Sequence, residues 1–248
     1  MEIKDMVAVV TGAGKGLGKA IAEKLSKEGA SLSLWDVESE GIDKLSKDLD
    51  ASGGRVLAIE ANVTKEETIA EAVRKTKEKF GRIDILVNNA GISRHQPIEE
   101  MSVENFSDVI NVNLTGTFIC CKHVIPIMKN QNNGKIVNIS SICGRTGRNG
   151  VGVNYAASKA GVIGITQTLA KSLGPSGINV NAICPGPILT DQLKVYPKEV
   201  FASWNVGRAV NKDGMPEDVA NAVLFLVSDK SGWITGISLD LNGGILIK

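Results

Sequence analysis

Short apolar runs rich in β-branched residues alternate along the chain with longer stretches in which apolar residues recur at helical spacing. The short runs predict strands at residues 6–11, 31–36, 55–60, 83–88, 135–140, 178–183 and 238–241. The longer stretches predict helices at residues 17–28, 39–49, 106–128, 154–173 and 216–227, with one more opening at residue 64. This alternation is typical of an α/β fold whose mainly parallel sheet carries helices on both faces.

Local signals refine two helix starts and one loop. Thr64 and Glu67 have the spacing of a capping box, and Pro216 suits the first position of a helix. The long irregular segment 186–215 predicts a substrate lid, in which Tyr196, Phe201 and Trp204 form an apolar flap. An ordinary surface loop with a small core of its own is the alternative. No linker or repeat divides residues 1–248, which are therefore predicted to form a single domain.

Composition and charge limit the kinds of partner that we expect this protein to bind. The formal net charge is +1 over 248 residues, which predicts no nucleic-acid or membrane partner. No run of 18 apolar residues is present to span a membrane, and the first residues do not have the pattern of a signal peptide. None of the four cysteines forms a C-x-x-C pair, so no metal site is predicted. Buried thiols in a reducing cytoplasm are the expected state, and the predicted location is cytoplasmic.

A glycine-rich turn follows the first predicted strand. Gly12, Gly16 and Gly18 leave room for the backbone to approach a pyrophosphate, and the next helix offers its N–H groups to the same anion. Lys15 and Leu17 lie within this turn. A tight turn without a ligand is the alternative, but the position between a strand and a helix favours a dinucleotide site.

The second predicted strand ends at Asp36, whose carboxylate suits the adenosine ribose hydroxyls and repels a 2′-phosphate. Asp36 therefore favours NAD(H), while Lys15 leaves NADP(H) possible; a helix-capping aspartate is the alternative. Asn62 and Val63 follow the third strand, and Asn88–Gly91 follow the fourth, at the sheet edge where ligands bind. We expect the side-chain oxygen of Asn62 to accept a hydrogen bond from the adenine amino group.

Tyr155 and Lys159 are four residues apart on a predicted helix and therefore share one face. An ammonium group beside a phenol lowers the pKa of the phenol, which makes Tyr155 a candidate acid or base for a ketone or an alcohol. An accidental surface pair is the alternative.

Taken in order, these motifs resemble the short-chain dehydrogenase/reductase family in its single-domain form. The resemblance rests on residues 11–18, 88–91 and 185–186 together with Asn113, Ser141, Tyr155 and Lys159. It implies a Rossmann-like, doubly wound fold with a seven-stranded sheet, a nicotinamide cofactor, and a homotetramer or homodimer. It also implies an oxidoreductase that interconverts a secondary alcohol and a ketone. A non-catalytic NAD-binding sensor is an alternative of another class, disfavoured because both Tyr155 and Lys159 are present.

The resemblance assigns roles to individual residues. Tyr155 would transfer the proton, Lys159 would bind the nicotinamide ribose and lower the pKa of Tyr155, Ser141 would bind the substrate oxygen, and Asn113 would hold a relay water. Ser141 lies one position further from Tyr155 than in many relatives, so Ser140 is the runner-up for its role. The cofactor would contact Gly12, Lys15, Gly16, Leu17, Gly18, Asp36, Asn62, Val63, Asn89, Ala90, Gly91, Tyr155, Lys159, Pro185, Gly186, Ile188 and Thr190.

The substrate is less closely defined. The chain looks most like 3-oxoacyl-[acyl-carrier-protein] reductases, yet Asn132 and Ser176 replace the basic residues with which those enzymes dock the carrier. A local similarity to sugar-acid dehydrogenases of the gluconate 5-dehydrogenase type makes a sugar-acid or polyol substrate an alternative. It rests on Arg94 and His95, on residues 188–191, and on Phe201 and Trp204. In that case Arg94 and Arg145 would bind a carboxylate, unless they are solvated surface residues. The predicted substrate pocket for a small polar hydroxy or oxo compound is formed by Ser141, Cys143, Tyr155, Gly186, Arg94 and Trp204.

Overall fold

The computed structural model describes residues 3–51, 55–190 and 198–247 of the 248-residue chain. A seven-stranded sheet runs through its centre in the order β3-β2-β1-β4-β5-β6-β7, and every pair of neighbouring strands is parallel. The predicted parallel sheet is therefore confirmed. The strands are β1 (Val7–Thr11), β2 (Ser31–Asp36), β3 (Val56–Glu60), β4 (Ile85–Asn88), β5 (Gly134–Ile139), β6 (Ile178–Pro185) and β7 (Ser238–Leu241).

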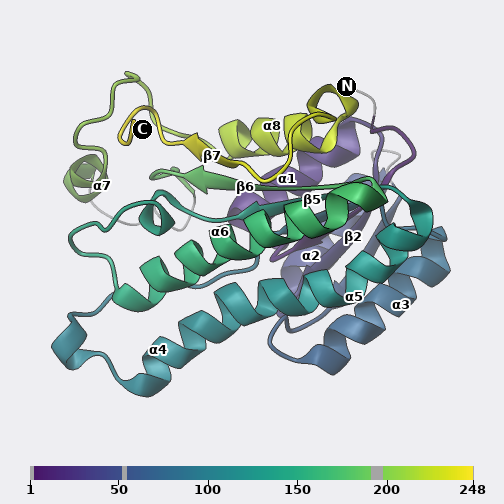
Figure 1. Cartoon of the computed structure of the whole chain (residues 1–248), viewed down its shortest axis with the longest axis horizontal. Coiled ribbons are helices and arrows are strands. Elements are labelled where there is room, and N and C mark those ends of the chain that lie inside the picture. The colour runs from purple at the N-terminus through teal and green to yellow at the C-terminus, as the bar shows by residue number, and fades with distance from the viewer. Residues whose placement is uncertain (1–2, 52–54, 191–197, 248) are drawn as a thin grey trace.

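Helices cover both faces of this sheet (Figure 1). They are α1 (Gly16–Lys27), α2 (Ser39–Ala51), α3 (Glu66–Phe80), α4 (Val103–Ile110), α5 (Gly116–Gln131), α6 (Val153–Leu173), α7 (Lys198–Trp204) and α8 (Pro216–Val227). One buried core contains residues of α1, α2 and α8, and a second contains residues of α3, α5 and α6. Successive side chains of β1 alternate between them, because Ala8 and Val10 enter the first core and Val9 the second.

The order of the strands fixes where a ligand can bind. The chain builds β1, β2 and β3 outward in one direction, and then returns to place β4 on the other side of β1. The loops that leave β1 and β4 therefore diverge at the carboxyl ends of these neighbouring strands. A crevice at such a switch point is the usual ligand site of an open α/β sheet.

The helix predicted at 106–128 is interrupted in the structure. It comprises α4, a π-helical turn at Asn111–Thr115, and α5. Insertions of this kind mark functional positions in many helices, and this one contains the buried Asn113. The periodicity of apolar residues did not reveal the turn, because one additional residue barely changes the helical pattern.

The capping box predicted at Thr64 is wrong. Helix α3 begins at Glu66, and its N-cap, Lys65, makes no side-chain capping bond. The Thr64 hydroxyl instead donates to Asn62 Oδ1, at 2.8 Å. The prediction for Pro216 is confirmed, since α8 begins there.

The described part of segment 186–215 is only partly irregular. It contains α7, whose buried Phe201 meets Trp204 edge to face with ring centroids 6.2 Å apart. Near its start, the Leu189 N–H donates to the Gly214 carbonyl at 2.8 Å, which joins the two ends of the segment. Tyr196, predicted for the same flap, lies outside the described residues. No helix in the described ranges is long and apolar enough to span a lipid bilayer.

Candidate active site

The turn between β1 and α1 is built from glycines that no other residue can replace. Gly12 and Gly16 have φ values of 63° and 57°, where a side chain is strained. A Cβ on Gly18 would lie 2.0 Å from the Gly12 carbonyl oxygen. The Asn89 amide holds the turn from the neighbouring strand, donating to the carbonyls of Thr11 and Gly12 at 3.0 Å each.

This turn fits a dinucleotide. The first turn of α1 contains no acidic residue, and its N-cap, Lys15, makes no side-chain capping bond, so the N–H groups there remain available for an anion. Within the described part of the chain, a Cβ on Gly16 would meet only the Thr190 methyl group, at 3.9 Å. Thr190, one of the cofactor contacts implied by the family resemblance, thus lies beside the glycine turn.

Asp36, at the end of β2, lies beside the glycine turn. Its Oδ2 accepts from the Gly14 N–H at 2.9 Å, and its Oδ1 accepts from the Glu38 N–H at 3.1 Å. Glu38 also forms an ion pair with Lys15, with 3.1 Å between Nζ and Oε2. Asp36, Glu38 and Glu60 line one depression of about 580 Å³. Carboxylates therefore dominate this end of the crevice, and the one lysine of the glycine turn is partly neutralised.

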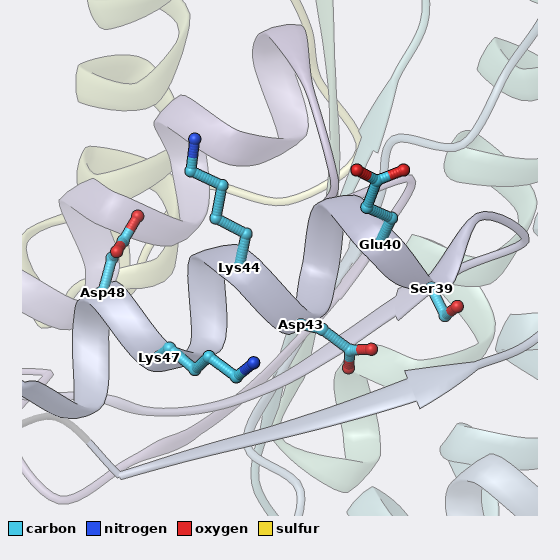
Figure 2. Close-up of a pocket in the computed structure, with 6 residues that line it drawn as sticks. All are labelled: Ser39, Glu40, Asp43, Lys44, Lys47 and Asp48. Atoms are coloured by element: carbon cyan, nitrogen blue, oxygen red, sulfur yellow. The ribbon is translucent and has the colours of Figure 1, made fainter.

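A neighbouring depression of about 480 Å³ lies on α2 alone. Figure 2 shows its side chains projecting from that helix on different sides, with acidic and basic groups interspersed; they are Ser39, Glu40, Asp43, Lys44, Lys47 and Asp48. Side chains from a single helix that do not converge form a solvated helix surface rather than a binding site. The crevice beside α2 is therefore the better candidate.

Asn62 is engaged within its own turn. Its Oδ1 accepts from the Thr64 N–H at 2.9 Å and from the Thr64 hydroxyl. The Thr64 hydroxyl would have to rotate away for Asn62 to accept from an adenine amino group, and that contact stays a prediction. The next residue, Val63, packs against α5, where a Cβ on Gly116 would meet it at 2.7 Å.

Ser141 and Tyr155 meet at the carboxyl end of β5. Ser141 opens a short 3-10 turn, Ile142–Gly144, and its Oγ accepts from the Cys143 N–H at 3.1 Å. Burial raises the pKa of Tyr155 to about 12, while the side-chain hydrogen bond with Ser141 acts in the opposite direction. The Ser140 hydroxyl instead donates to the Lys159 carbonyl at 2.8 Å. Ser140 is therefore engaged with α6, and the geometry favours Ser141 as the residue that binds the substrate oxygen.

Lys159 is buried in α6, with 5% of its surface exposed. Burial lowers its pKa to about 8. Its Nζ lies 5.8 Å from the centroid of the Tyr155 ring and donates to the Ile139 carbonyl at 2.8 Å. In the protein alone, burial is the main influence on the pKa of Tyr155, and the Lys159 ammonium group donates to a backbone carbonyl. That Lys159 lowers the pKa of Tyr155 stays a prediction.

Asn113, in the π-helical turn, connects three elements. Its Oδ1 accepts from the Ile92 N–H at 2.8 Å, and its Nδ2 donates to the Ile92 carbonyl at 2.9 Å and to Ser158 Oγ at 3.0 Å. A Cβ on Gly91 would lie 3.1 Å from Asn113 Oδ1 and 3.4 Å from Lys159 Nζ. The structure thus brings Gly91, Asn113 and Lys159 together, with the Asn113 side chain committed to positioning the loop after β4.

The two arginines proposed for anion recognition are both paired with carboxylates. Arg94 donates to Asp108 Oδ2 at 2.6 Å and to Asn105 Oδ1 at 3.3 Å, which ties it to α4. Arg145 donates to Asp240 Oδ2 at 3.1 Å, which ties the Ser141 turn to β7. The Arg94 guanidinium thus has a carboxylate partner already, which weakens the case for the predicted contact with a substrate carboxylate.

Two other predicted substrate residues, Gly186 and Trp204, contact residues other than Tyr155. The Gly186 N–H donates to the Leu241 carbonyl at 2.9 Å, and a Cβ there would crowd Asn242 at 2.9 Å. The Trp204 carbonyl accepts from the Arg148 guanidinium at 2.7 Å. Cys143, in contrast, lies close enough to Tyr155 to influence its pKa.

The residue that sequence reasoning missed is His95. Its ring meets the Tyr155 ring edge to face, with centroids 5.7 Å apart and an interplanar angle of 84°. Its position next to Arg94 was visible in the sequence, but no periodicity or motif distinguished the two side chains. No three His, Cys, Asp or Glu side chains gather into a metal-binding arrangement in the part of the chain that the structure describes.

Comparisons with known proteins agree with this site. The family described as enoyl-(acyl carrier protein) reductase matches residues 12–246. A 3-oxoacyl-[acyl-carrier-protein] reductase of Thermotoga maritima is 42% identical over 247 residues, covering 100% of both chains. One of Synechocystis is 39% identical and covers 97% of both.

Solved structures of similar proteins share this fold over almost the whole chain. The crystal structure of gox2181 has a TM-score of 0.95 at 33% identity, covering 98% of this chain and 96% of the other. Levodione reductase has a TM-score of 0.93 at 35% identity, covering 98% of both chains. The chain therefore belongs to the short-chain dehydrogenase/reductase family, and it is an oxidoreductase that acts on CH–OH or ketone groups with a nicotinamide cofactor.

Proposed function

We propose that this protein interconverts a ketone and a secondary alcohol with NAD(H), on a small polar hydroxy or oxo substrate, with Tyr155 as the acid/base group. The observation that carries the proposal is the meeting of Ser141 and Tyr155, with Lys159 beside them, at the sheet edge that also holds the glycine turn. When bound, the nicotinamide supplies or accepts the hydride.

The protonation state of Tyr155 suits reduction. A pKa of about 12 keeps the phenol protonated at neutral pH, so it can donate its proton to the carbonyl oxygen that receives negative charge. Ser141, already hydrogen-bonded to the phenol, would hold the same oxygen. In the oxidative direction the phenolate is needed, and a positive charge placed nearby favours it. Lys159, with its pKa of about 8, is mostly charged at pH 7 and supplies such a charge.

The preference for NAD(H) rests on charge at the end of β2. Asp36 and Glu60 line the depression there, and Glu38 pairs with the lysine that would otherwise attract a 2′-phosphate. Three carboxylates repel a phosphate group. NADP(H) is therefore expected to be used poorly.

A carrier-bound 3-oxoacyl thioester is the second candidate substrate, supported by relatives of that name at about 40% identity over the whole chain. Asn132 and Ser176 carry no positive charge for a carrier, and they precede β5 and β6. They therefore lie at the sheet edge opposite Tyr155. A sugar-acid or polyol substrate has lost its main support, because Arg94 and Arg145 already face carboxylates.

One assay separates these substrates. NADH oxidation is measured with a panel of simple ketones, keto acids and a 3-oxoacyl thioester, the last presented both on a small thiol and on a carrier protein. Turnover of neutral ketones or of the small thioester supports the proposal, whereas activity confined to the carrier-bound form supports the second candidate. Absence of any turnover with either NADH or NADPH would overturn both.

Assembly into a homotetramer or homodimer completes the proposal. Val103 of α4 and Phe118 of α5 are 83% and 53% exposed, and Trp233, near β7, is fully exposed. Association of copies would cover such apolar surface. Light scattering on the purified protein tests this, and a monomer at micromolar concentration would contradict it. The four free thiols fit the expected cytoplasmic location.

A further inference from the structure

His95 is held against the active site by a contact that defines the state of its ring. The Gly152 N–H donates to His95 Nδ1 at 3.1 Å, so this nitrogen carries no proton. Partial burial lowers the pKa of His95, which keeps the imidazole neutral at neutral pH. A neutral ring with a bare Nδ1 carries its single proton on Nε2. His95 therefore presents one N–H donor of known position on the ring.

The Gly152 contact is part of a close fit between two segments. Gly152 precedes α6, the helix that carries Tyr155, and a Cβ there would lie 2.7 Å from the Arg94 carbonyl oxygen. The loop after β4 is thus pressed onto the start of α6, with no space for a side chain between them. Arg94 fixes the same loop to α4 through Asp108. Two contacts of this loop, one with Gly152 and one with α4, therefore hold the His95 ring beside the Tyr155 ring.

His95 is an exposed residue, so its Nε2–H, which has no protein acceptor among the described residues, is open to a ligand from solution. Its ring also meets the ring of Tyr155, the proton donor of the reaction. From these contacts we infer that His95 is a specificity-determining residue, whose Nε2–H binds a second oxygen of the substrate adjacent to the carbonyl that Tyr155 protonates. A neutral donor suits an uncharged oxygen, such as an ester or thioester carbonyl or a hydroxyl group. The inference rests on the proposed function and narrows its substrate to ketones that carry a second, uncharged oxygen near the reacting carbonyl, of which a 3-oxo ester is the form tested below.

The test uses two variants, each of which keeps one function of the His95 ring and removes the other: the Nδ1 contact with Gly152 or the Nε2–H donor. In His95→Asn the side-chain oxygen replaces Nδ1 and keeps the Gly152 contact, while the Nε2–H is lost. In His95→Gln the amide nitrogen replaces Nε2 and keeps the donor, while the Gly152 contact is lost. The substrates are ethyl 3-oxobutanoate and 2-heptanone, which have equal chain length and differ in the ester oxygens. The measured quantity is the ratio of kcat/KM for the keto ester to that for the simple ketone, with NADH.

We expect His95→Asn to lower this ratio about tenfold, through KM of the keto ester, because one hydrogen bond to the substrate is lost. His95→Gln should keep the ratio close to that of the wild type. A wild-type ratio in His95→Asn overturns the inference, and so does a ratio lowered in His95→Gln alone, which would identify a purely structural contact. Arg74→Gln is the control: it removes an exposed ion pair on α3, away from the site, and should leave the ratio unchanged.

Nitrogen NMR of the imidazoles provides a readout that does not depend on turnover. The chain has two histidines, so His123→Gln assigns the signals of His95. We expect a protonated Nε2 and a bare Nδ1 at neutral pH, and a shift of the Nε2 signal when ethyl 3-oxobutanoate is added with NADH. The opposite tautomer would overturn the inference while leaving the proposed function intact. Failure of the wild type to reduce either ketone would overturn the proposed function and, with it, this inference.

Discussion

The cofactor end and the substrate end of this active site are built in different ways. At the cofactor end, the backbone forms the site. Gly12, Gly16 and Gly18 lie within seven residues, and their spacing shapes the turn. At the substrate end, Ser141, Tyr155 and His95 come from three separate segments and meet only through side-chain contacts. A site made of local backbone tolerates few substitutions, whereas one made of side chains can change its specificity one residue at a time.

The largest expected effect tests the substrate end. Tyr155→Phe keeps the ring that meets His95 and removes the proton, so turnover should fall by about 10² or more, the usual size of general acid–base assistance. NADH affinity should remain near that of the wild type, because the glycine turn is untouched. Steady-state kinetics and NADH fluorescence titration measure the two quantities. Near-normal turnover in the variant would remove Tyr155 from the mechanism.

Gly18→Ala tests the cofactor end. The new Cβ would lie 2.0 Å from the Gly12 carbonyl oxygen, so the turn must open. We expect the free energy of unfolding to fall by about 1–3 kcal/mol, as for other overpacked sites, together with a marked loss of NADH affinity. Denaturant titration and fluorescence titration measure these changes. Ala20→Gly, on the same helix but outside the turn, is the control, and equal NADH affinity in Gly18→Ala and the wild type would contradict the packing argument.

Lys159→Met separates catalysis from stability. The pKa of Lys159 is lowered to about 8 in the folded protein, so between pH 8 and 10.5 the unfolded chain binds more protons than the folded one. The free energy of unfolding of the wild type should therefore rise by about 1–3 kcal/mol, relative to that of the variant, as the pH increases through this window. At neutral pH the variant should be more stable than the wild type and less active. Unfolding curves at several pH values check this, and parallel pH profiles for the two proteins would contradict it.

The smallest expected effect concerns cofactor choice. Asp36→Asn keeps an oxygen that can accept from the Gly14 N–H and removes the charge that repels a 2′-phosphate. The ratio of kcat/KM for NADH to that for NADPH should fall by about tenfold, equivalent to ~1.4 kcal/mol. Glu38→Gln, which frees Lys15 from its ion pair, should lower the ratio less. A wild-type enzyme that prefers NADPH would show that the carboxylates do not control this choice.

Much of the molecule was predictable because its determinants are local. Short continuous apolar runs specified the seven strands and apolar faces at helical spacing specified most helices, since both faces of the sheet had to be covered. The glycine turn and Asp36 were visible for the same reason: each adjoins a strand end. The capping box at Thr64 failed because the neighbouring Asn62 provided Thr64 with a closer partner.

The sequence by itself determined the fold, the cofactor crevice and the pair formed by Tyr155 and Lys159, because these depend on periodicity and on short spacings. The tertiary structure alone decided which side chains were free to act. It paired Arg94 with Asp108, turned Ser140 away from the site and brought His95 to Tyr155. It also decided the pKa of Tyr155, because burial depends on every segment packed around the phenol and not on the lysine four residues away.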